Sequence, residues 1–300
     1  MSYSLAPEDD TATDTLRRIA RAELGALHAA AEAGAAGAPD PQAAALLVHD
    51  LRKGIKRMRG LLRLVRPGFA PFAEENAALG AAALGISALR DAEVQRQVLI
   101  ELGADESDPE GAATARRVLA ALPDHHAAVA PAALTAFAEA TAEIRKRARH
   151  WSLAHKGWSA FAPGLATSYA QCQARMFAAR AAGTDEACHA WRSRAKHHWY
   201  HARLLAPIWP EMLAPRIEAT DRLGETLGDH HDLAMLAEAL EAGLGAAAEV
   251  DLAPLTRLLR ARQAREETEA FRLGARLFAE EPEALTRRWG HWFRLWRAAR

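Results

Sequence analysis

A basic segment of 19 residues occurs twice in the chain, 140 positions apart, and this duplication constrains the fold more than any other feature. The first copy spans residues 49–67, HDLRKGIKRMRGLLRLVRP, and the second spans residues 189–207, HAWRSRAKHHWYHARLLAP. The residues that match at this offset are His49 and His189, Arg52 and Arg192, Lys56 and Lys196, Arg63 and Arg203, and Pro67 and Pro207. A further pair of segments, 90–94 and 231–235, matches at an offset of 141. We interpret the chain as a duplicated helical unit.

Each basic segment is predicted to form one helix whose cations share a face. Cations recur every three or four residues in the first copy, the interval that places side chains on one side of an α-helix. They are His49, Arg52, Lys56, Arg59, Arg63 and Arg66. Residues 49–67 contain seven Lys or Arg and one acid, and residues 189–207 contain four Lys or Arg, four His and no acid. Because a solvated helix face usually interleaves acids among its cations, we interpret the two faces as anion-binding surfaces.

Composition limits the class of protein and its partners. The chain has 38 basic and 38 acidic residues, so any attraction for anions must come from local charge rather than from net charge. Its two cysteines, Cys172 and Cys188, have no paired spacing, which is typical of a protein from a reducing compartment. The N-terminal sequence MSYSLAPEDD lacks the apolar core of a signal peptide, and the apolar runs are too short to span a bilayer. We therefore expect a soluble cytoplasmic protein without a membrane partner.

The rest of the chain also carries helical periodicity, interrupted by Pro and Gly. The predicted helices are 13–36, 41–66, 71–102, 109–122 and 131–154 in the first half, and 164–182, 184–206, 211–243, 253–279 and 283–298 in the second. The fold class is therefore all-α, with five helices per half forming two packed bundles. We expect residues 1–12 to be a tail and the two repeats to cover about 13–158 and 159–300.

Catalytic and metal-binding patterns are weak. His197 and His201 are four residues apart on a predicted helix, a spacing compatible with metal binding, but chance pairs are expected among 13 histidines. Asp91 and Asp232 could be paired catalytic carboxylates, but we favour a structural role in which each neutralises a neighbouring Arg. The sequence has no Gly-rich phosphate loop and no nucleophile motif. We expect no enzymatic activity, no cofactor and no bound metal.

The two H-x-x-R-x-x-x-K helices, each followed by a [R/H]-D-x-x-[V/M] segment, resemble the CHAD family, the conserved histidine α-helical domain. The resemblance covers about Thr13 to Trp296. It implies two pseudo-symmetric helical bundles packed around a central basic channel. It also implies binding of inorganic polyphosphate, often at polyphosphate granules in bacteria. Trp199 stands where the first copy has Arg59, so the resemblance assigns no ligand at that position.

The resemblance and the basic segments together predict a set of polyphosphate ligands. The residues carried over from the family pattern are His49, Arg52, Lys56, Arg59, Arg63, His189, Arg192, Lys196 and Arg203. We add four other cations to the predicted set, namely Lys53, Arg145, Arg149 and Arg175.

Three other functions are compatible with parts of this pattern. A binder of nucleic acid or nucleotide phosphates would use the same cations, but only Trp199 and Tyr200 are available among them for base stacking, and we do not expect nucleic acid to be the partner. A metal-dependent phosphohydrolase would use His197, His201 and Asp232. A purely structural helical scaffold would have no ligand that responds to salt.

Overall fold

The computed structural model describes residues 3–37, 40–86, 91–122, 130–244 and 249–299, and these ranges contain helices and no strand. The all-α prediction is thus confirmed for the described residues. None of their helices is long and apolar enough to cross a membrane. The α-helices are α1 (Ala12–Gly37), α2 (Pro41–Val65), α3 (Phe72–Gly85), α4 (Asp91–Gly103), α5 (Pro109–Ala121), α6 (Pro131–Ala148), α7 (Ala162–Ala182), α8 (Asp185–Leu205), α9 (Pro210–Glu241), α10 (Ala253–Leu277) and α11 (Pro282–Ala298). Three short 3₁₀ helices are η1 (Arg66–Gly68), η2 (Gly157–Ala160) and η3 (Ala206–Ile208).

Two of the predicted helices differ from the structure. The helix predicted over 71–102 is two helices, because α3 ends at Gly85 and α4 begins at Asp91. The helix predicted over 131–154 ends at Ala148, and the chain then turns so that Trp151 is buried against Phe69. The indole of Trp151 donates a hydrogen bond to the Glu75 carboxylate at 3.2 Å, so a tertiary contact replaces the last predicted helical turns.

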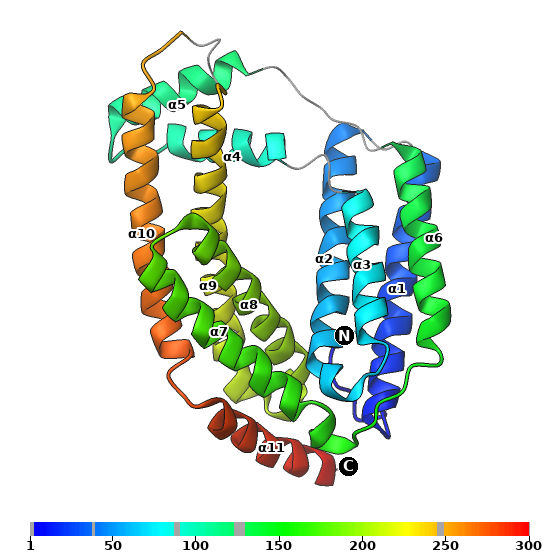
Figure 1. Cartoon of the computed structure of the whole chain (residues 1–300). Helices are drawn as coiled ribbons and strands as arrows, with labels where there is room; N and C mark the ends of the chain where they lie inside the picture. Colours follow the sequence, from blue (N-terminus) through cyan, green and yellow to red (C-terminus); the bar gives the residue numbers. More distant parts are fainter. Residues whose placement is uncertain (1–2, 38–39, 87–90, 123–129, 245–248, 300) are drawn as a thin grey trace.

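The helices form two groups that do not coincide with the halves of the chain. Helices α1, α2, α3 and α6 lie together, and α7, α8, α9 and α10 lie on the other side (Figure 1). Helices α4 and α5 belong to the first half of the chain but pack on α9 and α10, where they enclose a separate apolar core. The buried members of that core include Leu99, Leu102, Val118, Leu236 and Leu258.

The N-terminal segment predicted as a tail is packed in its described part. Tyr3, Leu5 and Asp9 are buried. The backbone N–H of Leu5 donates to the carbonyl of Leu204 at 2.9 Å, and Asp9 forms an ion pair with Arg18 at 2.8 Å. The apolar side chains in this segment explain the packing, because leaving them in water would forgo their burial energy.

The two basic helices, α2 and α8, approach each other at a glycine. A Cβ atom added to Gly60 would lie 2.9 Å from the Cβ of Tyr200, which is the residue that matches Gly60 at the 140-residue offset. Beside this contact, His201 Nε2 donates to the Gly60 carbonyl at 2.9 Å. On another side of α2, Gly164 of α7 is so close that an added Cβ would overlap the carbonyl oxygen of Leu64. These contacts fix the position of α2 relative to α7 and α8.

A pair of Gly→Ala variants tests this close packing. Gly164→Ala should lower the free energy of unfolding by about 3 kcal/mol, because backbone cannot move aside as a flexible side chain would. Gly80→Ala in α3 should raise it by about 1 kcal/mol, because the added Cβ meets open space and Ala favours the helix. Urea denaturation of both variants would measure the difference in unfolding free energy. Similar values for the two variants would contradict the close packing of α7 on α2.

Candidate functional site

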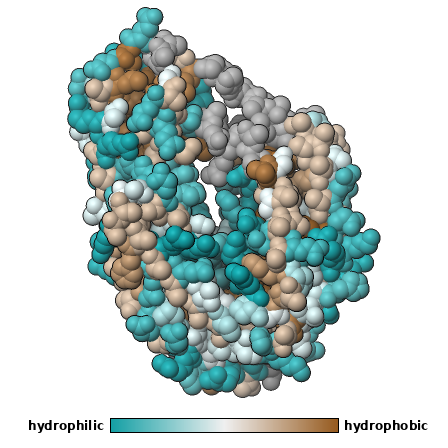
Figure 2. All heavy atoms as spheres, in the orientation of Figure 1, coloured by the Kyte–Doolittle hydropathy of each residue, from teal (hydrophilic) through white to brown (hydrophobic). Residues whose placement is uncertain are grey.

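Two adjoining cavities lie between α2 and α8, with α4 and α9 completing their walls. The smaller chamber has a volume of about 380 Å³ and the larger chamber about 870 Å³. Their shared lining residues are Arg52, Lys56, Val94, Arg192, Lys196 and Tyr200. Because of these common walls we treat the chambers as one basic groove. Figure 2 shows a hollow on this face, bordered by hydrophilic residues.

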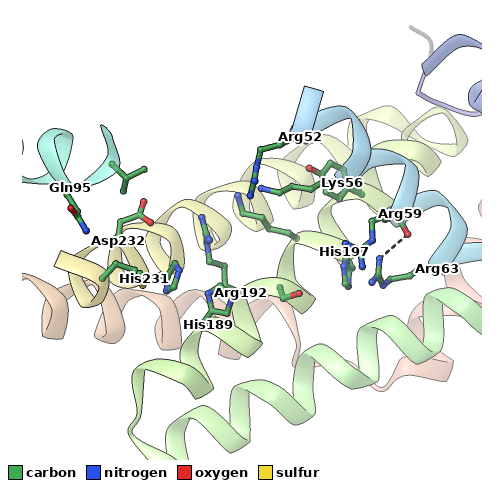
Figure 3. A pocket seen from close by; sticks show the side chains of 15 residues that line it. Arg52, Lys56, Arg59, Arg63, Gln95, His189, Arg192, His197, His231 and Asp232 are labelled. Carbon is green, nitrogen blue, oxygen red and sulfur yellow. Dashed lines mark hydrogen bonds between the residues drawn. The ribbon is translucent and has the colours of Figure 1, made fainter. Parts of the chain in front are cut away.

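Ten of the thirteen predicted ligands line the basic groove. Arg52, Lys56, Arg192 and Lys196 line both chambers. Arg59, Arg63 and His189 line the smaller chamber, and His49, Lys53 and Arg203 line the larger one. The helical spacing of the two segments therefore brings cations from distant parts of the sequence to one cavity (Figure 3).

The other three predicted ligands lie elsewhere. Arg145 on α6 faces α1, where its guanidinium carbon would be 3.5 Å from a Cβ added to Gly25. Arg149 is exposed at the C-terminal end of α6, and Arg175 is exposed on α7. None of the three lines either chamber. The sequence does not reveal which side of α6 and α7 faces α2, so their cations could not be sorted by pattern alone.

Arg59 and Arg63 define one end of the smaller chamber. Arg59 Nε donates to Asn76 Oδ1 at 3.0 Å, and Arg63 Nη1 donates to the backbone carbonyl of Arg59 at 3.2 Å (Figure 3). These partners are neutral. Burial lowers the pKa of Arg63 to about 10, and the positive charges of Arg59, Arg194 and Arg66 contribute to this lowering. The chamber thus concentrates positive charge at a point where an anion would be stabilised strongly.

His197 lies beside these two arginines and was missed as a predicted ligand (Figure 3). Burial, followed by the charges of Arg63, His201, Arg194 and Arg59, lowers its pKa to about 2. The ring is therefore neutral at physiological pH. The sequence contained a usable pattern, because His189, Ser193 and His197 follow one another at intervals of four residues and all line the smaller chamber.

The opposite end of the smaller chamber carries a mixture of polar groups. The rings of His189 and His231 are 4.1 Å apart between centroids, and Gln95 and Asp232 complete the lining (Figure 3). Burial and the charge of Arg192 lower the pKa of His189, and Asp232 opposes this effect. Arg90 and the side chain of Asp91 match His231 and Asp232 at the 141-residue offset, and both lie outside the described residues.

His201, one of the two histidines considered as metal ligands, makes another contact, and so do His198 and His230. His201 is buried and bonded to the Gly60 carbonyl, and His198 is buried and accepts a hydrogen bond from Arg216 Nε at 3.1 Å. His230 is 3.7 Å from Asp185 and does not line the basic groove. Within the described ranges, no group of three or more His, Cys, Asp or Glu side chains is placed to hold a metal ion.

The family pattern of the CHAD domain matches residues 18–241. The chain belongs to the CHAD-domain family. The match begins within α1 and ends at the last residue of α9, so it contains both basic helices and the whole lining of the groove. Helices α10 and α11 lie beyond the matched range, although the resemblance in sequence was expected to extend to Trp296. No curated protein and no solved structure matches the chain.

The CHAD domain should lose stability in acid because it holds His197 and His201 in the neutral form. The folded-state pKa values of His197 and His201 are lowered to about 2 and about 4, whereas unfolded His titrates near 6.5. The unfolded chain therefore binds more protons below pH 6.5, and stability falls as the pH falls through that value. From pH 7 to pH 5 each histidine should remove up to about 2 kcal/mol.

Chemical denaturation across this pH range would measure the effect. His197→Asn should make the free energy of unfolding less dependent on pH, because it removes one of the titrating rings. His291→Asn is the matched control, because His291 is exposed on α11. Equal pH dependence in the wild type and the His197 variant would show that His197 is not held neutral.

Proposed function

We propose that this CHAD domain binds inorganic polyphosphate in the basic groove without catalysing a reaction. The observation that carries the proposal is that both copies of the duplicated cationic helix line the same groove. In this proposal the helix groups around α2 and α8 are pseudo-symmetric and the groove between them is the central channel of the fold. One shared feature supports that symmetry, because each basic helix is followed by a 3₁₀ helix that contains a proline, Pro67 after α2 and Pro207 after α8.

The charge of polyphosphate suits such a groove. A linear polyphosphate carries about one negative charge per phosphate and presents no side groups, so recognition depends on donors placed along its path and on counterion release. The basic groove supplies donors from two opposite helices while the chain as a whole has no net charge. The rest of the surface therefore attracts anions only weakly, and the affinity for polyphosphate is concentrated at the groove.

The groove residues have distinct roles in this proposal. Arg59 and Arg63 bind phosphate oxygens through their planar guanidinium groups, because charge-assisted hydrogen bonds are stronger than neutral ones. Lys56 and Lys196 provide compact charges at the junction of the two chambers. His49 and His189 donate to phosphate or hold neighbouring Arg side chains in position.

A binding role without catalysis agrees with the contacts of the histidines. A metal-dependent phosphohydrolase would need His197, His201 and Asp232 near one ion. Instead, the His201 ring is bonded to Gly60, while Asp232 lies at the opposite end of the smaller chamber from His197 (Figure 3). We further propose that binding recruits the protein to polyphosphate granules, where many chains of the ligand are concentrated.

Titration of polyphosphate at low and high salt, with charge-matched single-stranded DNA as competitor, tests this function. Binding should weaken steeply with salt, and DNA should displace polyphosphate poorly. The double variant Lys56→Ala/Lys196→Ala should weaken binding by about tenfold or more for each lysine, because a charged hydrogen bond contributes about 1.5–3 kcal/mol. The slope of affinity against salt should also fall, by about one unit for each lysine that no longer neutralises a phosphate.

The matched control is Arg149→Ala/Arg175→Ala, which removes two exposed cations outside the groove. Its affinity should remain close to that of the wild type. Equal reductions of affinity in the two double variants would contradict the groove as the site. Equal displacement by DNA would indicate a general binder of polyanions, and absence of binding at low salt would reduce the basic helices to a structural role.

A further inference from the structure

The two chambers of the basic groove differ in chemistry although the helices that line them are duplicates. Arg59 and Arg63 line the smaller chamber, and the matching residues of the second copy, Trp199 and Arg203, line the larger one. One cation of the pair is thus replaced by an indole. The Arg203 guanidinium carbon lies over the Trp199 ring, 4.6 Å from its centre, so the two side chains are layered into a cationic platform for stacking.

The remaining walls of the larger chamber carry His49 and Lys53 together with apolar and acidic side chains. Leu46, Val48 and Ile217 contribute an apolar surface, and Leu46 is 62% exposed. Asp221 and Glu225 add two carboxylates from α9. The matching positions of the first copy are Ala81 and Gly85, so these two carboxylates occur in the second copy alone.

This lining suits only part of a phosphate chain. Phosphates that continued past Lys56 and Lys196 would meet Lys53 and Arg203, but also two carboxylates and an apolar wall, which lower the benefit of each further negative charge. An uncharged, flat group attached to the phosphates would instead gain from the same surface. Nucleobases stack on aromatic rings and on guanidinium planes, and carboxylates accept hydrogen bonds from amino and hydroxyl groups. The chamber, at about 870 Å³, is also in the size range of small-molecule sites.

We propose that the groove binds a nucleoside polyphosphate, with its phosphates in the smaller chamber and its nucleoside in the larger chamber. This inference rests on the proposed function, because the phosphates use those of its cations that line the smaller chamber. The base stacks on the Arg203–Trp199 platform. Asp221 and Glu225 accept hydrogen bonds from ribose hydroxyls or from the amino group of the base, which favours adenine, cytosine and guanine over uracil and thymine.

Calorimetric titrations of two ligands with equal numbers of phosphates test the proposal. The probes are adenosine 5′-tetraphosphate and inorganic tetrapolyphosphate. The wild type should bind the nucleotide at least about fivefold more tightly, because stacking of one base contributes about 1–3 kcal/mol. Trp199→Arg, which restores the cation of the first copy, should remove this preference and strengthen tetrapolyphosphate binding. Trp199→Phe should retain most of the preference because the ring still stacks.

The matched control is Trp209→Arg, since Trp209 is 41% exposed and does not line the groove. It should leave the ratio of the two dissociation constants unchanged. A wild type without preference for the nucleotide, or a ratio unaffected by Trp199→Arg, would overturn the nucleoside site while tetrapolyphosphate binding still supported the proposed function. If neither ligand binds, the proposed function fails and the inference fails with it.

Discussion

The close contact between α2 and α8 is the constraint on which the groove depends. Two helices that present cations to each other repel, so close packing and hydrogen bonding must hold them together. That contact is formed where Gly60 accepts the side chain of Tyr200 and the His201 ring donates to the Gly60 carbonyl. Tyr200 is buried there and also lines both chambers. Tyr200 therefore belongs both to the contact between the two helices and to the lining of the groove.

Two buried carboxylates form ion pairs with arginines that lie outside the groove. Arg57 forms an ion pair at 2.6 Å with the buried carboxylate of Glu23, and Arg147 pairs at 2.8 Å with the buried Glu75. Neither pair lines the groove. Arg59 is only two residues from Arg57, but it donates to the neutral amide of Asn76. Because residues two apart point in different directions on a helix, one basic segment carries both a structural ion pair and cations that face the groove.

The sequence predicted the helices better than it predicted how the helices are arranged in space. Periodicity depends on local spacing, so the cations of 49–67 and 189–207 could be assigned to one face of each helix before any tertiary contact was known. The break between α3 and α4 could not be inferred, because Gly85 is tolerated within a helix as well as at its end. His197 lines the groove and Arg145 does not, and this difference depends on which helices face each other. That information lies in contacts such as Gly164 with Leu64, which no spacing rule encodes.

Divergence between the copies explains how a duplicated chain forms an asymmetric site. In the second copy α9 continues from Pro210 to Glu241, whereas the matching region of the first copy is divided between α3 and α4. The division lets α4 leave the first group of helices and pack on α9, where Val94, Gln95 and Gln97 close the groove. A second unbroken helix would have kept these residues beside α2. The broken helix therefore provides a wall that exact duplication could not, and the asymmetry between the two chambers begins with that change in the backbone.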